Sequence, residues 1–374
     1  MQLCLRGIKI RNKMAEKILV ALSGGVDSAV ALALLKQQGC DVQAAYMKTW
    51  MNEEGIDVFG DCPWHQDIED CQAVCKHLNV KFESVDFIKE YHEQIVEYLV
   101  EGYRLGRTPN PDVMCNRRMK FGKFLDYAKT NGFDTVATGH YCAIRENSDG
   151  SRDLEMGADP SKDQSYFLAM ITQTQLQHAS FPIGSLLKSQ VRDIARMEGL
   201  PNSEKKDSQG ICFLGKIKIQ DFLRHYIPEK EGDIVNKAGK VLGKHRGLYN
   251  YTLGQRKGIG VPSNADNERY VVIAKDFENN RLVIEFESAK SQELYKSQTN
   301  IVEINWINKP IEQQCELFAR VRYRDELVKI LFTPTSQTSA KIEFAQPQRA
   351  IASGQVMAIH APNQTTILGG GFYE

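Results

Sequence analysis

The sequence carries no excess charge of either sign, because 47 Lys and Arg residues balance 47 Asp and Glu residues. A uniformly basic protein of the histone kind is therefore excluded, and a nucleic-acid partner requires a local gathering of basic residues. Long apolar runs are also missing: the longest, residues 29–35, falls far short of the ~18 residues that a membrane-spanning helix needs. We therefore expect no membrane partner.

Cysteine is sparse, with nine residues in 374, and no secretory hydrophobic segment opens the chain. A disulfide scaffold is excluded, and we expect a reducing compartment, the cytoplasm. Several metal-ligating side chains cluster between residues 62 and 77, yet the chain has no CxxC pair, so we expect neither zinc nor an iron–sulfur cluster. The clustered residues are Cys62, His65, Cys71, Cys75 and His77.

Apolar runs and turn signals alternate along the first part of the chain. This alternation is typical of an α/β fold with a doubly wound parallel sheet, whose sites lie at the carboxyl ends of its strands. After residue 232, short alternating runs and an Asn279-Asn280 hairpin signal predict two smaller β-rich domains, the last a small antiparallel β-barrel. The pattern predicts strands over 16–22, 41–47, 81–87 and 133–139, and helices over 28–38, 64–78, 88–102 and 116–131.

We expect domain limits near residues 216 and 287. They give an α/β domain over 16–216, a central β-rich domain over 217–287 and a β-barrel over 288–374. Residues 1–15 hold four basic residues and no acid, which fits either a transit-peptide fragment or an upstream start codon. We favour an extension that is not native, because the first strand follows Met14 at once.

A glycine-rich loop, Ser23-Gly24-Gly25-Val26-Asp27-Ser28, follows the first apolar strand and opens a helix. Consecutive small residues let backbone N–H groups converge on an anion, and the helix N-terminus adds partial positive charge. The loop matches neither GxxxxGK[ST] nor GxGxxG. The alternative is a tight turn capped by Ser23 or Asp27; the position between strand and helix favours a phosphate site.

The SGGVDS loop resembles the pyrophosphate-binding loop of the PP-loop ATP pyrophosphatase superfamily. The resemblance implies cleavage of ATP between its α- and β-phosphates and transient adenylation of a carbonyl oxygen. It also implies that Asp27 helps to hold Mg²⁺, a cation that prefers oxygen ligands. The superfamily includes amide-forming synthetases and tRNA-thiolating enzymes, so the loop alone leaves the substrate open.

Two cysteines lie in polar, basic segments. Cys115 ends the run PNPDVMC, and we expect it at the start of a helix capped by Asn116, where the helix dipole and neighbouring arginines favour a thiolate. Cys212 lies in KKDSQGICFLG, between glycines and after two lysines. The alternative for either cysteine is a buried small hydrophobic residue.

With PNPDVMCN, ATGHY, KDQSYF, KKDSQGICFLG and YTLGQRKGIG in this order, the chain resembles the tRNA-specific 2-thiouridylase family from residue 16 onward. The resemblance implies that Cys115 is the nucleophile and Cys212 the persulfide carrier, with tRNA and a persulfide donor (a cysteine desulfurase or a sulfur-relay protein) as partners. The target base would meet Asn110, Pro111 and Asp112. ATP would bind at Ala21, Leu22, Ser23, Gly24, Gly25, Val26, Asp27, Ser28, Met47 and Gly139. The tRNA would contact His140, Lys162, Asp163, Gln164, Arg322, Tyr323 and Gln355.

These residues suffice for thiolation of a uridine. Transfer of AMP to the C2 oxygen of uracil makes that oxygen a leaving group, and the loop with Mg²⁺ stabilises the departing pyrophosphate. A persulfide on Cys212 attacks C2, and Asp112 serves as general acid or base. Cys115 supplies the second thiol, so that the outer sulfur stays on C2 and a Cys115–Cys212 disulfide forms. Two other functions stay open: a PP-loop amidating synthetase on a non-RNA substrate, and a non-catalytic RNA-binding module.

Basic residues gather in three stretches despite the zero net charge. Residues 102–125 hold six basic residues and one acid, and residues 234–265 hold six basic residues and no acid. Arg320, Arg322 and Arg324 alternate, so we expect them on one face of a strand. Together these stretches predict contacts with the phosphates of tRNA.

Overall fold

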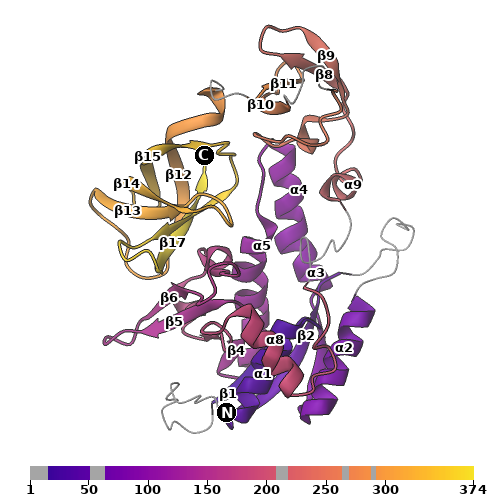
Figure 1. Cartoon of the computed structure of the whole chain (residues 1–374), viewed down its shortest axis with the longest axis vertical. Coiled ribbons are helices and arrows are strands. Elements are labelled where there is room, and N and C mark those ends of the chain that lie inside the picture. The colour runs from indigo at the N-terminus through magenta and orange to yellow at the C-terminus, as the bar shows by residue number, and fades with distance from the viewer. Residues whose placement is uncertain (1–15, 51–63, 208–217, 263–268, 288–291) are drawn as a thin grey trace.

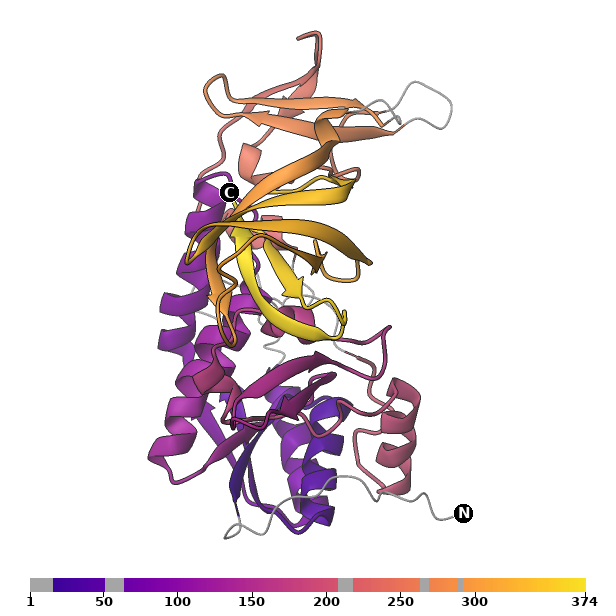
Figure 2. The ribbon, with the colours of Figure 1, turned by 90° about the vertical axis from the view of Figure 1, so that its left-hand side faces the viewer.

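The computed structural model describes residues 16–50, 64–207, 218–262, 269–287 and 292–374, so Cys62 and Cys212 lie outside the described residues. The α/β domain forms one end of the molecule, the central β-rich domain the other, and the barrel lies beside both (Figures 1 and 2). Helix α4 (Glu97–Arg104) rises from the α/β domain to the central domain (Figure 1). Within the described residues, no helix is long and apolar enough to cross a membrane.

The predicted parallel sheet is confirmed. Its five strands lie in the order β3-β2-β1-β4-β7, and every neighbouring pair is parallel. The strand order reverses between β1 and β4, because β2 and β3 extend the sheet on one side of β1 and β4 extends it on the other. In sheets of this kind, ligands bind outside the carboxyl ends of the strands at such a point. The strands are β1 (Lys17–Leu22), β2 (Asp41–Lys48), β3 (Phe82–Asp86), β4 (Thr135–Ala137) and β7 (Ala179–Ser180).

Helices cover both faces of this sheet, as its sequence pattern requires. Ile18, Val20 and Ala44 pack with α1 (Val26–Gln37), α2 (Trp64–Leu78) and α8 (Lys188–Met197). Leu19 and Ala45, one residue further along each of these strands, pack on the opposite face. That face is covered by two long helical runs, 88–104 and 111–130. In the first run, the π-helical segment His92–Val96 joins α3 (Ile88–Tyr91) to α4. In the second run, the π-helical segment Cys115–Lys123 joins α5 (Pro111–Met114) to α6 (Phe124–Thr130).

The predicted C-terminal barrel is confirmed and closed, because β12 pairs with both β15 and β17. The expectation for its arginines is wrong: β13 ends at Arg320, and Arg322 and Arg324 lie in the turn that follows, where Arg324 has a φ of 70°. The strands are β12 (Tyr295–Trp306), β13 (Cys315–Arg320), β14 (Leu327–Ser336), β15 (Ser339–Arg349), β16 (Val356–His360) and β17 (Thr366–Tyr373).

The central domain holds a four-stranded sheet in the order β10-β11-β8-β9. The Asn279-Asn280 hairpin is confirmed, since β10 and β11 pair antiparallel across it and Asn280 has a φ of 50°. The elements are α9 (Ile219–Leu223), β8 (Gly232–Asn236), β9 (Val241–His245), the short helix Leu248–Asn250, β10 (Tyr270–Asp276) and β11 (Arg281–Phe286).

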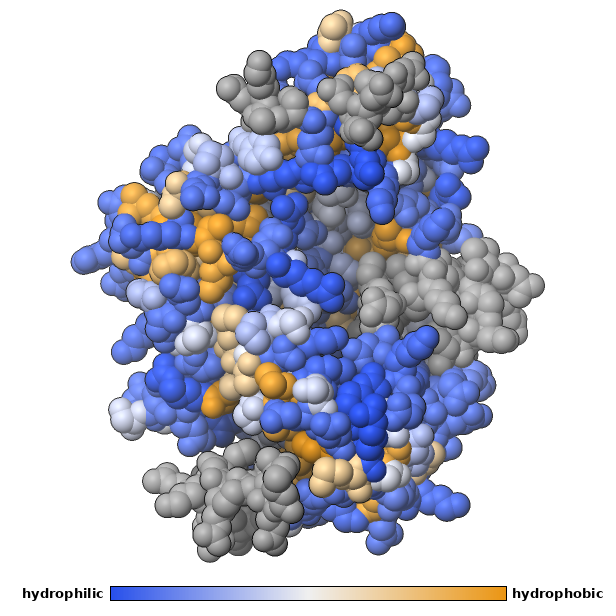
Figure 3. All heavy atoms as spheres, viewed as in Figure 1, coloured by the Kyte–Doolittle hydropathy of each residue, from blue (hydrophilic) through white to orange (hydrophobic). Residues whose placement is uncertain are grey.

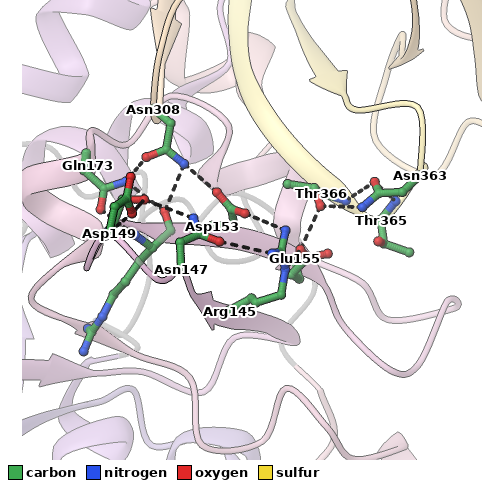
Figure 4. A network of polar contacts seen from close by, with 12 residues as sticks. Arg145, Asn147, Asp149, Asp153, Glu155, Gln173, Asn308, Asn363, Thr365 and Thr366 are labelled. Atoms are coloured by element: carbon green, nitrogen blue, oxygen red, sulfur yellow. Dashed lines mark hydrogen bonds and ion pairs between the residues drawn. The ribbon is translucent and has the colours of Figure 1, made fainter.

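A hairpin of the α/β domain, β5 (Cys142–Glu146) and β6 (Arg152–Met156), extends the sheet of the barrel, because β6 pairs with β17. Polar contacts close this junction (Figure 4): Thr366 Oγ1 donates to Glu155 at 2.7 Å and Asn308 Nδ2 to Asp153 at 2.5 Å. The barrel is thus bonded to the α/β domain. The short elements nearby are helices Ser165–Leu168, α7 (Gln173–Leu176) and Gln292–Leu294.

Candidate active site

The glycine-rich loop lies at the carboxyl end of β1, where α1 begins with Gly25 as its N-cap. Gly24 has a φ of 73°, and a Cβ added there would lie 2.9 Å from the Cα of Asp67 on α2. Only glycine fits this position, because the conformation and the space both exclude a side chain. Ser28 closes the loop: its Oγ donates to the Gly25 carbonyl at 3.1 Å and accepts from Ser23 N at 3.2 Å.

Gly139 follows β4 and lies directly against the loop. A Cβ added to Gly139 would lie 2.6 Å from Ser28 N and 2.7 Å from the Asp27 carbonyl carbon. The structure therefore brings the loop and Gly139, which are far apart in sequence, to the reversal point between β1 and β4. Ala21 and Leu22 end β1, and Met47 lies near the end of neighbouring β2.

Asp27 carries two partners that sequence reasoning missed. Tyr141 Oη donates to its Oδ1 at 2.7 Å, and Lys188 Nζ donates to both carboxylate oxygens at 2.7 and 3.0 Å. Lys188 begins α8, and only 14% of its side chain is exposed. Nothing in the local sequence of Lys188 connects it with the loop, because the contact depends on how α8 packs against α1.

Lys188 also pairs with Asp207 at 2.7 Å. Asp207 further accepts from Lys162 at 3.0 Å and Arg192 at 2.7 Å. Burial raises the pKa of Asp207, but hydrogen bonds from Lys188 and Lys162 outweigh it, and the pKa falls to about 2. Asp207 directly precedes the segment 208–217, which holds Cys212 and lies outside the described residues. The polar cluster around Lys188 thus extends from the glycine-rich loop to the beginning of the Cys212 segment.

The helix that carries Cys115 begins earlier than predicted. Asn110, not Asn116, is its cap: Asn110 Oδ1 accepts from Val113 N at 3.2 Å, and Pro111 occupies the first helical position. The Asn-Pro pair was the signal for this start, because proline fits the first turn and asparagine the cap. Cys115 therefore lies one turn inside the helix and is 2% exposed, so its expected polar loop setting is wrong.

Asp112 lies in the first turn of α5 and is half-buried. Asn116 is buried, and its Nδ2 donates to the Phe167 carbonyl at 3.2 Å. The segment 162–167 is also linked indirectly to the glycine-rich loop, because Gln164 Oε1 accepts from Tyr141 N at 3.0 Å and Tyr141 bonds to Asp27. This segment connects the glycine-rich loop with the Asn110–Cys115 region.

The residues expected to contact tRNA gather where the barrel meets the α/β domain, but their side chains have partners inside the chain. Asp163 is buried and pairs with Arg320 of the barrel at 2.8 Å. His140 is buried, which lowers its pKa well below the usual value, and its Nδ1 lies 2.7 Å from Thr138 Oγ1. The expected tRNA contacts therefore stay predictions.

The remaining expected tRNA residues lie on the barrel turns. Arg322 pairs with Asp325 at 3.1 Å, and the ring of Tyr323 lies 4.3 Å from that of Phe167. Gln355 Nε2 donates to the Thr108 carbonyl at 2.6 Å. Figure 3 shows a mostly hydrophilic face that is hollowed where the three domains approach each other.

The cysteines of α2 are structural. Cys71 and Cys75 are buried, and burial raises the pKa of each thiol to about 12. Across the described residues, no group of three or more His, Cys, Asp and Glu side chains is placed to hold a metal ion. The carboxylate of Asp27 in the glycine-rich loop is half-exposed, and carboxylates are ligands that Mg²⁺ takes together with phosphate and water oxygens.

A glycine-rich loop at the reversal point of a parallel sheet, followed by two β-rich domains, defines a nucleotide-binding α/β protein with accessory β-rich domains. Family models agree: the tRNA methyl transferase HUP domain matches residues 16–216, the tRNA methyl transferase PRC-barrel domain residues 220–285, and the aminomethyltransferase beta-barrel domain residues 296–372. Relatives up to 49% identical over 96% of the chain show that the chain belongs to the tRNA-specific 2-thiouridylase family.

Relatives named tRNA-specific 2-thiouridylase MnmA support this assignment along almost the whole chain. The protein of Akkermansia muciniphila is 49% identical over 96% of this chain and 98% of its own length. That of Streptococcus thermophilus is 42% identical over 96% of this chain and 95% of its own. A 4-thiouridine synthetase–RNA complex with bound ATP is a more distant likeness, 17% identical with a TM-score of 0.36, covering 56% of this chain and 50% of its own.

Proposed function

We propose that the protein is a tRNA-uridine 2-sulfurtransferase that converts the wobble uridine of tRNA to 2-thiouridine with ATP and a persulfide. The observation that carries this proposal is the segment 162–167, which is linked through Tyr141 to Asp27 of the glycine-rich loop and bonds through Phe167 to Asn116, the residue after Cys115. A nucleotide bound at the loop and a base bound beside Asp112 would therefore share one site. Membership of the thiouridylase family supports the same reaction.

The first step joins the two substrates. ATP binds at residues 21–28 with Met47 and Gly139, and the C2 oxygen of uracil attacks the α-phosphate, which releases pyrophosphate. The backbone N–H groups of the loop and the N-terminus of α1 stabilise the leaving pyrophosphate. Asp27 would hold Mg²⁺, which neutralises phosphate charge when bound. Lys188 is placed to neutralise either Asp27 or an incoming phosphate, because its ammonium already lies between two carboxylates.

The second step transfers sulfur. The terminal sulfur of a Cys212 persulfide attacks C2, and AMP leaves with the former C2 oxygen. The Cys115 thiolate then attacks the inner sulfur of Cys212, so the outer sulfur stays on C2 and a Cys115–Cys212 disulfide forms. A thiol reductant must cleave this disulfide before the next turnover. Asp112, on the same helical turn as Cys115, serves as general acid or base.

Domain limits near residues 216 and 287, a cytoplasmic location, and a cysteine desulfurase or sulfur-relay protein as donor are part of the same proposal. The amidating synthetase remains the alternative from another class. It would form AMP with ammonia and a carboxylate, and it gives Cys115 and Cys212 no role. A non-catalytic RNA-binding module would bind tRNA without forming AMP.

Nucleoside mass spectrometry tests the proposal. Unmodified tRNA is incubated with the full chain, ATP, Mg²⁺ and a persulfide source, and the digest is searched for 2-thiouridine. We expect 2-thiouridine in the digest and one AMP per thiolated tRNA, with neither product when ATP is omitted. Formation of AMP only with ammonia and a carboxylate substrate would instead establish the synthetase, and tRNA binding without AMP the binding module.

A further inference from the structure

The loop that precedes the expected base-recognition residues is held by both accessory domains. It runs from the end of α4 at Arg104 to Asn110. The central domain holds Gly106, whose carbonyl accepts from Lys275 Nζ at 2.7 Å. Gly106 has a φ of 74°, and the ring of Phe277 fills the space that a Cβ would need.

The barrel holds the next part of the same loop through Thr108. Both backbone polar groups of Thr108 are bonded to the turn before β16: its N–H donates to the Ser353 carbonyl at 2.8 Å, and its carbonyl accepts from Gln355 Nε2 at 2.6 Å. Between these two contacts, Gly354 has a φ of 85°, and a Cβ there would lie 2.9 Å from Arg107 Cβ. The turn 353–355 therefore fits closely around Thr108.

The segment that follows Thr108 is conformationally restricted, so it couples the position of Thr108 to that of Asn110. Pro109 and Pro111 flank Asn110, and each proline ring fixes its own φ. Pro109 is buried, and its ring fills the space beside Gly102, where an added Cβ would lie 2.7 Å from Pro109 Cγ. A shift of Thr108 would therefore move Asn110 and the first turn of α5 together.

A second contact ties the barrel to Asn110. Tyr166 is buried, and its hydroxyl donates to the Val356 carbonyl at 2.8 Å. Burial raises the pKa of Tyr166, and a hydrogen bond with the Asn110 side chain counteracts that rise. Val356 directly follows Gln355, so one end of β16 contacts both Thr108 and, through Tyr166, Asn110.

We propose that Gln355 is a positioning residue: by holding Thr108, the barrel turn 353–355 sets where Asn110 and Asp112 meet the target base and where the helix that carries Cys115 begins. This inference rests on the proposed thiolation, and it assigns Gln355 a different role from direct binding of tRNA. The barrel then contributes to the reaction itself, because its docking determines the geometry of a site on another domain.

Two variants test it, and the glycine variant has a matched control. Gln355→Ala removes the bond to Thr108, and Gly354→Ala adds a methyl group against Arg107. Gly150→Ala is the control for Gly354→Ala, because Gly150 has a nearly equal φ of 83° but nothing within 4 Å of the added Cβ. The rate of 2-thiouridine formation at saturating tRNA, the Kd for tRNA and the thermal midpoint are measured for each.

We expect both Gln355→Ala and Gly354→Ala to lower the saturating rate by about tenfold or more, since misplacement by ~1 Å can cost ~100-fold. The Kd for tRNA should stay within about twofold of wild type, and Gly150→Ala should keep the wild-type rate. Gln355→Glu, which keeps the length but replaces the donor amide by a carboxylate, should behave like Gln355→Ala.

The outcome that overturns the proposal is a raised Kd for tRNA with an unchanged saturating rate in Gln355→Ala, which would make Gln355 a tRNA ligand. Equal rates in Gly354→Ala and Gly150→Ala would overturn it as well. If Gly354→Ala does not fold, the Gln355 variants decide alone. A wild-type chain that forms no 2-thiouridine in this assay would refute the proposed function and not this inference.

Discussion

Lys188 donates hydrogen bonds to both carboxylate oxygens of Asp27, at 2.7 and 3.0 Å, across 161 positions of sequence. The same ammonium lies 2.7 Å from Asp207, the last described residue before the Cys212 segment. Lys188 thus pairs both with the loop that we expect to bind pyrophosphate and with the residue directly before the segment that we expect to carry sulfur.

Loss of the Lys188 charge should impair adenylation. For Lys188→Met, we expect tRNA-dependent pyrophosphate release to fall by about 100-fold, the usual effect of removing one charge-stabilising group from a transition state. Arg196→Met is the matched control, because Arg196 lies on the same helix and its ion pairs with Asp193 and Glu204 are exposed. Pyrophosphate release by Lys188→Met at the rate of the control would show that the ammonium has no part in the step.

Asp27→Ala complements that experiment. We expect it to abolish adenylation while the chain stays folded, because Lys188 keeps Asp207 as an ion-pair partner. AMP formation with uridine-containing tRNA measures the first effect and the thermal midpoint the second. Wild-type AMP formation in Asp27→Ala would contradict the assignment of Asp27 to the nucleotide site.

The central domain should contribute phosphate contacts. Lys244, Arg246 and Lys257 are exposed. Charge reversal at these three residues should weaken tRNA binding and make the affinity for tRNA less dependent on salt concentration. Each lost contact should reduce the slope of log Kd against log salt concentration by roughly 0.7–0.9. The effect of Lys244 should be the smallest, because it already pairs with Asp233 at 2.8 Å. A slope equal to that of wild type in the triple variant would show that this surface does not bind the tRNA backbone.

Lys275 should make stability depend on pH. Burial lowers its pKa from 10.5 to about 8, so between these values the unfolded chain binds a proton that the folded chain does not. The contribution of Lys275 to the free energy of unfolding therefore rises as pH increases from 8 to 10.5, and it is least favourable below pH 8. The free energy of unfolding is measured at pH 7.5 and 9.5 for wild type and for Lys275→Met. The variant should lack the rise that Lys275 contributes, and an equal rise in both proteins would contradict the prediction.

Substitution of Cys115 and of Cys212 should have different effects on sulfur transfer. Cys212→Ser should accept no persulfide and form no 2-thiouridine, whereas Cys115→Ser should still carry sulfur on Cys212 but fail in transfer. The burial of Cys115 strengthens this expectation, because a 2% exposed thiol is a poor target for an external donor. Labelled persulfide followed by peptide mass spectrometry measures the site. Label on Cys115 with normal thiolation in Cys212→Ser would reverse the assignment.

Sequence alone determined the features that depend on neighbouring residues. The apolar strand, the small residues of SGGVDS and the following helix predict the nucleotide loop, because a close turn and a free helix N-terminus are local properties. The hairpin at Asn279-Asn280 and the alternating strands of the barrel follow from the same local chemistry. The start of α5 was equally local, since Asn110 and Pro111 form a cap and a first turn, but the prediction placed it five residues too late.

Only the tertiary structure decided the contacts between distant segments. Lys188 reaches Asp27 across 161 positions and Gln355 reaches Thr108 across 247, and no local pattern encodes such pairs. The burial of Cys115 and of the Asp163–Arg320 pair depends in the same way on how helices and the barrel pack around them. Charge and motif predict which chemistry a residue can perform; packing decides which residues meet, because burial and partner distance are set by the whole fold.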